Sequence, residues 1–269
     1  MQCDEVPDSK INATTDKDMI AGFPKSGDSM EANNTSVTFL KLLNEFYKKI
    51  NFESYLQGNK NNYGTIISEV EKNVPVNLIP VMEGFYQKQF SAYYLVPSLN
   101  LFPTTGFGKM NKTTNAIYNV LGALGVQSFK STPPVLAFDY PDKILGLTVH
   151  EFGHSFVNPA IDKVPKDIIE KTKYLYAPIK DAMSSKGYIY WISCLYEHFV
   201  KAGEVLIARQ LGQNERAEKL MEDNVKEKFL YLPQIVQQLE IYNDNKKNYK
   251  SYDDYIVQVV ENLKPVENQ

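Results

Sequence analysis

The stretch Thr148-Val149-His150-Glu151-Phe152-Gly153-His154-Ser155-Phe156 places two histidines four positions apart, with a glutamate directly after the first. Residues four apart lie on the same face of an α-helix, with their Cβ atoms about 6 Å from each other, so both rings can direct a nitrogen at one ion. This spacing suits zinc, which binds histidine nitrogens in tetrahedral sites. Glu151 is rotated by about 100° from His150, and we expect it to reach a metal-bound water as a general base instead of binding the metal.

The motif is predicted to lie on a short, well-bounded internal helix. Apolar residues recur there at spacings of three and four, which is typical of one buried helix face. The residues of that face are Leu145, Val149, Phe152 and Phe156. Pro141-Asp142 supplies a turn and an N-cap before the helix, and Asn158-Pro159 is a stop signal after it. The alternative is a helix with two histidines by chance, which the presence of only three histidines in the chain disfavours.

The composition is that of an ordinary globular protein. The 269 residues are 43% hydrophobic, which is enough to bury a sizeable core. The formal net charge of −3, with both signs mixed along the chain, excludes the basic stripe of a nucleic-acid-binding protein. No apolar run reaches the roughly 18 residues that a membrane span requires, and residues 1–30 lack the apolar core of a signal peptide.

The two cysteines, Cys3 and Cys194, are too few for a disulfide framework, and we expect no bridge between them. Cys3 permits two interpretations. It is an ordinary cysteine near the terminus, or it is the lipidated cysteine of a lipoprotein whose signal has been cleaved. The second interpretation implies a lipid anchor, and we expect an extracytoplasmic location, whether secreted, periplasmic or lipid-anchored.

The chain is predicted to comprise a flexible N-terminal arm, 1–32, and one domain, 33–269. The arm is rich in small polar and charged residues. Within the domain, residues 33–159 form a mixed α/β subdomain that ends in the motif helix. Residues 160–269 form an all-helical subdomain, with a cleft between the two. The predicted fold class is therefore α+β, with a small mixed sheet in the N-terminal half.

Hydrophobic patterns place the individual elements. Short aromatic and β-branched runs predict strands at 93–96, 99–102 and 135–140, and Gly106-Phe107-Gly108 is predicted to be a loop. Helical spacing predicts the remaining elements. These predicted helices span 36–50, 63–73, 161–176, 187–210, 213–229, 232–242 and 252–263.

A catalytic zinc site needs a third protein ligand. The helix predicted at 187–210 offers three candidates, Glu197, His198 and Glu204. Apolar residues surround His198 on the helix surface, which favours a core role for His198 and a cleft-facing Glu197. These apolar residues are Trp191, Cys194, Ala202 and Val205. The alternative is that Glu197 and Glu204 form a solvated face together with Lys201.

His150-Glu151-Phe152-Gly153-His154, followed by a distant helix with Glu197-His198-Phe199-Val200-Lys201-Ala202, resembles the gluzincin class of zinc metallopeptidases. Residues 149–159 and 197–202 more closely resemble an uncharacterised family of bacterial zincin-like proteins, and this similarity covers residues 35–265. The resemblance implies a zincin-like fold, peptide hydrolysis, and Glu197 as the third zinc ligand beside His150 and His154.

The sequence departs from neighbouring patterns at several positions. Lys201 stands where some gluzincins have an aspartate that contacts a ligand, and Glu204 is one replacement for it. The metzincin pattern is excluded, because Val157 and Ala160 occupy the positions of its glycine and third histidine.

The resemblance implies a peptide or protein substrate and a zinc-activated water, with Glu151 accepting its proton. A further donor is expected to stabilise the oxyanion. Tyr188 and Tyr190 are the tyrosines nearest the ligand helix, and we choose Tyr190, which shares a helix stripe with Glu197. The strands at 93–96 or 99–102 offer an edge for an extended peptide.

Two alternative functions remain open. One is a catalytically silent zinc-binding protein of the cell surface, against which the intact Glu151 argues, because a structural zinc site has no use for a base. The other is an amidase that acts on cell-wall peptide and uses the same residues.

Overall fold

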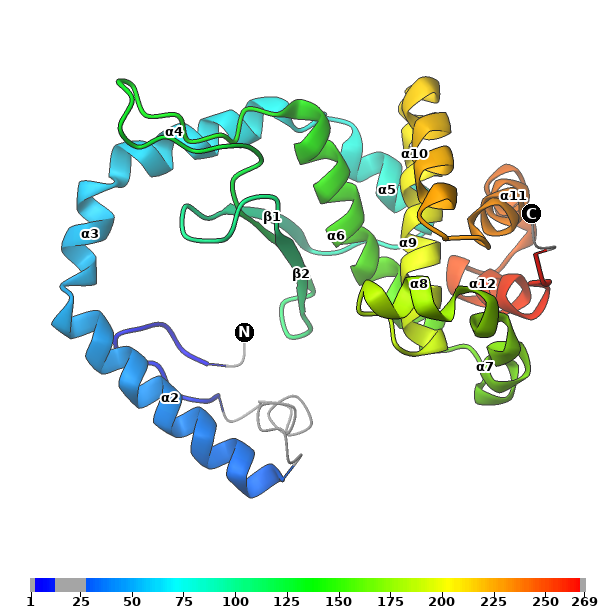
Figure 1. Ribbon diagram of the computed structural model, residues 1–269, viewed down its shortest axis with the longest axis horizontal. Helices are drawn as coiled ribbons and strands as arrows, with labels where there is room; N and C mark the ends of the chain where they lie inside the picture. Colours follow the sequence, from blue (N-terminus) through cyan, green and yellow to red (C-terminus); the bar gives the residue numbers. More distant parts are fainter. Residues whose placement is uncertain (1–2, 13–27, 267–269) are drawn as a thin grey trace. The chain divides into compact units, whose positions relative to one another are not determined.

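The computed structural model describes residues 3–12 and 28–266. They form two compact units, Met1–Thr65 and Ile66–Gln269, and helix α4 (Lys60–Asn73) crosses the boundary between them. Of the predicted arm, residues 1–2 and 13–27 lie outside the described residues. The HExxH motif and the whole sheet lie in the second unit (Figure 1).

The first unit contains α2 (Ser29–Lys49) and α3 (Phe52–Gly58). Helix α2 begins earlier than the predicted residue 36, because the Asp28 side chain accepts hydrogen bonds from the N–H groups of Met30 and Glu31 and so caps the helix. The Asn44 side chain of α2 exchanges two 3.0 Å hydrogen bonds with the backbone of Ser9. This part of the predicted arm is therefore held against α2.

The second unit contains one three-stranded sheet of β1 (Ala92–Pro97), β2 (Gly106–Asn111) and β3 (Ala116–Leu121). The strand order is β1-β3-β2, with β1 parallel and β2 antiparallel to the central β3. The sheet is thus small and mixed, as predicted, and together with the surrounding helices it makes the fold α+β. Both β1 and β2 are edge strands.

The sequence located only one of the three strands. The run 93–96 lies in β1, but 99–102 is a loop that follows Pro97 at the end of that strand. The predicted loop at 106–108 is instead the start of β2. No strand forms at 135–140, where Val135 makes a single bridge to Ser128 and Ala137 has a left-handed φ of 62° that ends the extended run.

The motif lies on α6 (Pro141–Ile161), a helix of 21 residues. Tyr140 is the N-cap and Pro141 the first helical residue, so the prediction that Pro141-Asp142 would supply the N-cap is wrong; proline is favoured at the first position because its missing N–H has no helical partner there. The predicted stop at Asn158-Pro159 is also wrong. The helix passes Pro159 and ends at Ile161, where the N–H of Asp162 still bonds the carbonyl of Asn158.

The other elements of the second unit are helices, and the chain after α6 is mainly helical, as predicted. The bounds are α5 (Leu78–Tyr86), α7 (Lys166–Thr172), η1 (Lys173–Ile179), α8 (Lys180–Ser185), α9 (Trp191–Gln210), α10 (Asn214–Lys226), α11 (Leu232–Asp244), η2 (Lys246–Asn248) and α12 (Tyr252–Glu261). The single helix expected at 161–176 does not form, because Pro165 separates α6 from α7. Helices α3, α5 and α8 were not predicted.

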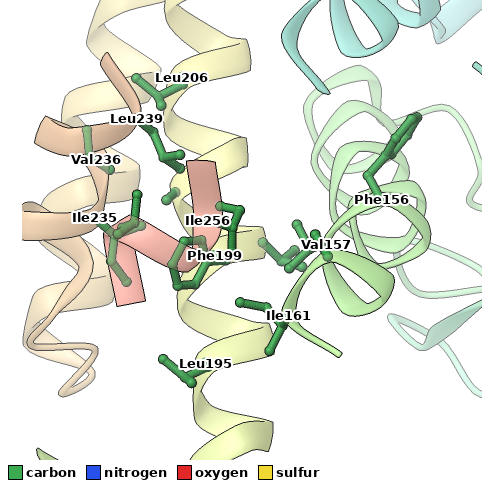
Figure 2. Close-up of a cluster of buried hydrophobic side chains, with 14 of the residues drawn as sticks. Phe156, Val157, Ile161, Leu195, Phe199, Leu206, Ile235, Val236, Leu239 and Ile256 are labelled. Carbon is green, nitrogen blue, oxygen red and sulfur yellow. The ribbon is translucent and has the colours of Figure 1, made fainter. Parts of the chain in front are cut away.

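Helices α6 and α9 pack along each other and share one apolar core with α11 and α12. Figure 2 shows the side chains that meet there. They are Phe156, Val157 and Ile161 of α6, Leu195, Phe199 and Leu206 of α9, Ile235, Val236 and Leu239 of α11, and Ile256 of α12. This packing fixes the rotation of α9 relative to the motif helix.

Gly153 of α6 and Gly203 of α9 leave room for the side chains that pack between the two helices. The hydroxyl of the buried Tyr86, from α5, points between them: a Cβ at Gly203 would overlap this oxygen, and one at Gly153 would lie 3.6 Å from it. The Tyr86 ring stacks on Phe156, with 4.5 Å between ring centroids. Gly153, inside the motif, therefore has a packing role between the two helices.

Cys3 and Cys194 are both free thiols, as predicted, and Cys194 is buried on α9. Within the described ranges 3–12 and 28–266, no helix is both long and apolar enough to cross a membrane.

Candidate metal centre

His150 and His154 of α6 and Glu197 of α9 bring one ligand atom each to a common point. The two Nε2 atoms are 3.3 Å apart, and Nε2 of His154 lies 3.2 Å from Oε1 of Glu197. Two atoms bound tetrahedrally to zinc at about 2.0–2.1 Å must lie about 3.3–3.4 Å from each other. Nε2 of His150 lies 3.9 Å from Oε2 of Glu197, so two of the three ligand pairs have the spacing that zinc requires and the third is somewhat wider.

Hydrogen bonds on the far side of each ring fix the tautomers. Nδ1 of His150 donates to Oε1 of Glu204 across 2.5 Å, and Nδ1 of His154 lies 3.2 Å from Oδ1 of Asn158. With a proton on each Nδ1, both Nε2 atoms present lone pairs to each other, and only a cation or proton between them removes the repulsion. This is the arrangement of metal-binding histidines whose second nitrogen is held by an acceptor.

Glu197 is 6% exposed, and its Oε2 is a buried atom with no hydrogen-bond partner among the described residues. Burial alone would raise the pKa of Glu197, but the hydrogen bond to His154 and the nearby charges of His150 and Lys201 outweigh it and lower the pKa. Glu197 is thus held ionised, as a metal ligand must be. Its burial is inconsistent with the solvated face that the sequence left open.

The pKa of His150 is shifted in the opposite direction to that of Glu197. Burial alone would lower its pKa, but the hydrogen bond to Glu204 and the neighbouring carboxylates raise it above its ordinary value. The side chains of His150 and His154 remain 24% and 22% exposed, so the site opens to solvent on one side.

His198 is a core residue, as predicted. It is fully buried, its Nδ1 bonds the carbonyl oxygen of Cys194 at 2.7 Å, and its ring lies against Phe229, with 5.0 Å between centroids. Burial lowers the pKa of His198 to about 4, so the ring is neutral at pH 7. It does not join the group formed by His150, His154 and Glu197.

Glu151 lies over strand β2. A Cβ added to Gly108 would be 2.6 Å from the backbone oxygen of Glu151 and 3.4 Å from its Oε2. A Cβ at Gly106 would likewise be 3.2 Å from the Leu147 side chain. The two glycines that suggested a loop are thus what lets an edge strand approach the motif helix.

The outer edge of β2 is unpaired. The N–H of Gly122 bonds the carbonyl of Thr105, and antiparallel pairing alternates, so the backbone groups of residues 107, 109 and 111 point toward β3. Those of Gly106, Gly108 and Met110 point outward, and the described residues give them no other hydrogen-bond partner. This open edge passes beside Glu151.

The two tyrosines considered for oxyanion stabilisation differ in position. Tyr190 is the N-cap of α9 and 67% exposed, and no hydrogen bond or ring contact among the described residues joins it to the three ligand candidates. Tyr188 lies closer: burial raises the pKa of its phenol, and the carboxylates of Glu197 and Glu151 raise it further. Tyr188 is therefore a protonated donor near both carboxylates.

A cavity of about 430 Å³ adjoins His150 and Glu204. Its other lining residues are Thr104, Leu124, Lys143, Gly146 and Leu147. The cavity extends toward the N-terminal end of α6 on the face of His150, so a ligand held at the candidate metal site has room on that side.

Two residues that contact the site were not predicted: Gly108 of β2 and Asn158 of α6. The contact of Asn158 with His154 could have been predicted, because Asn158 lies four residues after His154 and so shares its helix face. Nothing in the sequence pointed to Gly108, because the pairing of β2 with β3 places it beside α6. Glu204 was named both as a candidate ligand and as a replacement for an aspartate that contacts a ligand, and it does contact His150.

Residues 24–262 match the model of a family described as a domain of unknown function, DUF4932, and the chain belongs to this family. A search of curated proteins and a search of solved structures each gave no match.

Proposed function

We propose that the protein is a zinc-dependent peptide hydrolase with a zincin-like fold of the gluzincin type, in which His150, His154 and Glu197 hold the metal. The observation that supports this most directly is the spacing of their ligand atoms, 3.2–3.3 Å at His154, in a group whose rings are oriented by Glu204 and Asn158. The motif Glu151 beside that group favours catalysis over a purely structural metal.

Zinc bound there would supply a water of lowered pKa and polarise a substrate carbonyl. Glu151 would take the proton of that water and later deliver it to the leaving amine. The phenol of Tyr188, protonated and close to both carboxylates, would donate a hydrogen bond to the oxyanion. We propose Tyr188 for this role in place of Tyr190, which is exposed. Glu204 would keep the His150 ring in its binding orientation.

The open edge of β2 would hold the substrate. An extended peptide that hydrogen-bonds to Gly106, Gly108 and Met110 would run past Glu151, and strand addition of this kind gives affinity without sequence specificity. The side chains of such a peptide would then enter the cavity beside His150. A peptide substrate, including cell-wall peptide, fits this edge better than a compact small molecule.

The test uses the full chain purified without chelator, with metal analysis and digestion of a mixed peptide library. We expect about one zinc per chain, in line with a site of three protein ligands. Chelation should abolish cleavage and lower the melting temperature, because the metal binds the native state. A chain that holds no zinc under these conditions would refute the proposal.

Glu151→Gln separates catalysis from metal binding. It keeps the side-chain shape and removes the base, so zinc content should be unchanged while the cleavage rate falls by about 100-fold or more. The matched control is Glu218→Gln on the exposed face of α10, which should behave as wild type. Unchanged turnover in Glu151→Gln would exclude Glu151 as the base and leave the silent zinc-binding protein as the better account.

A further inference from the structure

Asn119 is a fully buried amide in the middle of the central strand, β3. Neither its Nδ2 nor its Oδ1 has a hydrogen-bond partner in the described part of the chain. A buried polar group without a partner costs free energy, and native proteins retain few of them. An apolar residue would fill this position with less penalty, so the amide calls for an explanation other than packing.

The strand register shows what Asn119 faces. It lies directly across from Gly108 of β2, in a pair that does not share backbone hydrogen bonds, and such pairs bring side chains within about 4.5–5.5 Å between Cβ atoms. The missing Cβ of Gly108 points at Glu151 and would lie 3.4 Å from its Oε2. Asn119 therefore shares the sheet face that lies under Glu151, one strand further from the edge.

A second unpaired polar group lies at the same contact between sheet and helix. The hydroxyl of Thr148, a residue that is 1% exposed, has no partner either. Thr148 is three residues before Glu151 and so lies on the same side of α6. It also borders a common cavity with Leu95, the residue that flanks Asn119 on its other side in the sheet.

We propose that Asn119 is a positioning residue for Glu151, and that Thr148 supports it. A rotation of the Glu151 side chain brings Oε2 within reach of the Asn119 amide N–H, which then donates to that oxygen and leaves Oε1 directed at the water between the metal ligands. The inference rests on the proposed hydrolase function. It explains why the chain keeps an unsatisfied amide beneath its general base, since the partner is engaged only when Glu151 adopts its working conformation.

Asn119→Leu and Asn119→Ser test the proposal, because we expect the leucine variant to be the more stable of the two and the serine variant to be the more active. Asn119→Leu removes the unpaired amide at similar volume, so the melting temperature should rise by about 2 °C or more. Its kcat should fall by about 10- to 100-fold, because Glu151 is no longer held. Asn119→Ser keeps a hydroxyl donor but leaves a cavity, so it should be less stable than wild type and yet more active than Asn119→Leu. KM and zinc content should be unchanged in both.

The matched control is Tyr252→Phe, which removes another fully buried and unpaired hydroxyl on α12. It should raise the melting temperature without changing kcat. Asn119→Leu with wild-type kcat, or Asn119→Ser less active than Asn119→Leu, would overturn the positioning role alone, because wild-type cleavage of the library would still stand. A wild-type chain that binds zinc and cleaves no peptide would overturn the hydrolase function and this inference together.

Discussion

The Glu204 carboxylate accepts a 2.5 Å hydrogen bond from Nδ1 of His150, which ties the second helix of the site to the first. Glu204 lies seven residues, or about two helical turns, beyond Glu197 on α9. One helix thus supplies both the third ligand candidate and the group that orients the first ligand. Because α6 and α9 also share the apolar core, the geometry of the candidate metal site and the stability of the fold depend on the same contact.

Glu204→Ala should weaken zinc binding by about 10- to 100-fold, because loss of a group that orients a ligand histidine has an effect of this size. The readout is a competition titration with a chromogenic chelator. Glu218→Ala, on the exposed side of α10, is the control and should bind zinc as wild type does. Equal affinities in the two variants would mean that the hydrogen bond does not support the site.

Glu197→Ala and His198→Asn separate two adjacent residues. Glu197→Ala should empty the metal site, because a ligand is lost, whereas His198→Asn should keep one zinc and lose stability, because it disturbs a buried ring that packs on Phe229. Metal analysis and melting temperature are measured on both variants. Zinc lost from His198→Asn and kept by Glu197→Ala would show that the gluzincin ligand set is wrong.

Gly108→Ala should damage the site through the backbone. The new Cβ would lie 2.6 Å from the carbonyl oxygen of Glu151, which cannot rotate away, so strand β2 or helix α6 must shift. Overpacking of this kind typically costs about 1–3 kcal/mol. We expect a lower melting temperature and reduced cleavage, measured beside Gly84→Ala on α5, whose added Cβ meets no atom within 4 Å. Wild-type behaviour of both variants would contradict the close approach of β2 to Glu151.

His198 should make the protein less stable in acid. Its pKa is lowered from 6.5 to about 4 by burial, so between these values the unfolded chain binds the proton and the folded chain does not. The stabilisation is complete above pH 6.5 and is lost as the pH falls toward 4, by an amount on the order of 3 kcal/mol.

The charged groups near the ring act in opposite directions, since Glu197 raises the pKa of His198 and Lys201 lowers it. Urea unfolding of metal-free wild type and His198→Asn at pH 7 and pH 5 provides the measurement. The variant should be less stable at pH 7 but lose less stability on acidification. Parallel losses in the two proteins would contradict a neutral buried ring.

The parts of the site that lie within one helix could be predicted from the sequence. His150 and His154 converge because the helical repeat places residues four apart on one face, and that repeat depends only on local backbone geometry. The core position of His198 followed in the same way from the apolar residues around it. Glu197 and Glu204 could be named as candidates because they share a stripe of the same helix, α9.

Strand positions were predicted poorly. The run Ala116–Leu121 contains a buried asparagine, and Gly106 and Gly108 have the composition of a loop, yet both segments form strands because each supplies hydrogen bonds to the other. Such pairing involves residues distant along the chain, and intrinsic strand preference is weak beside it.

The sequence by itself therefore determined the motif helix, the pair His150 and His154 on one face of it with Glu151 beside them, and the helical nature of the second half. Only the tertiary structure decided that Val200 of α9 packs on Gly153 of α6, that the histidine contacted by Glu204 is His150, and that Tyr188 lies closer than Tyr190 to the carboxylates. The position of Gly108 and Asn119 on the sheet face beneath Glu151 was also decided by the tertiary structure alone. The physical reason is that a side chain's direction along a helix is fixed by local dihedral angles, whereas the meeting of two elements depends on how their surfaces pack.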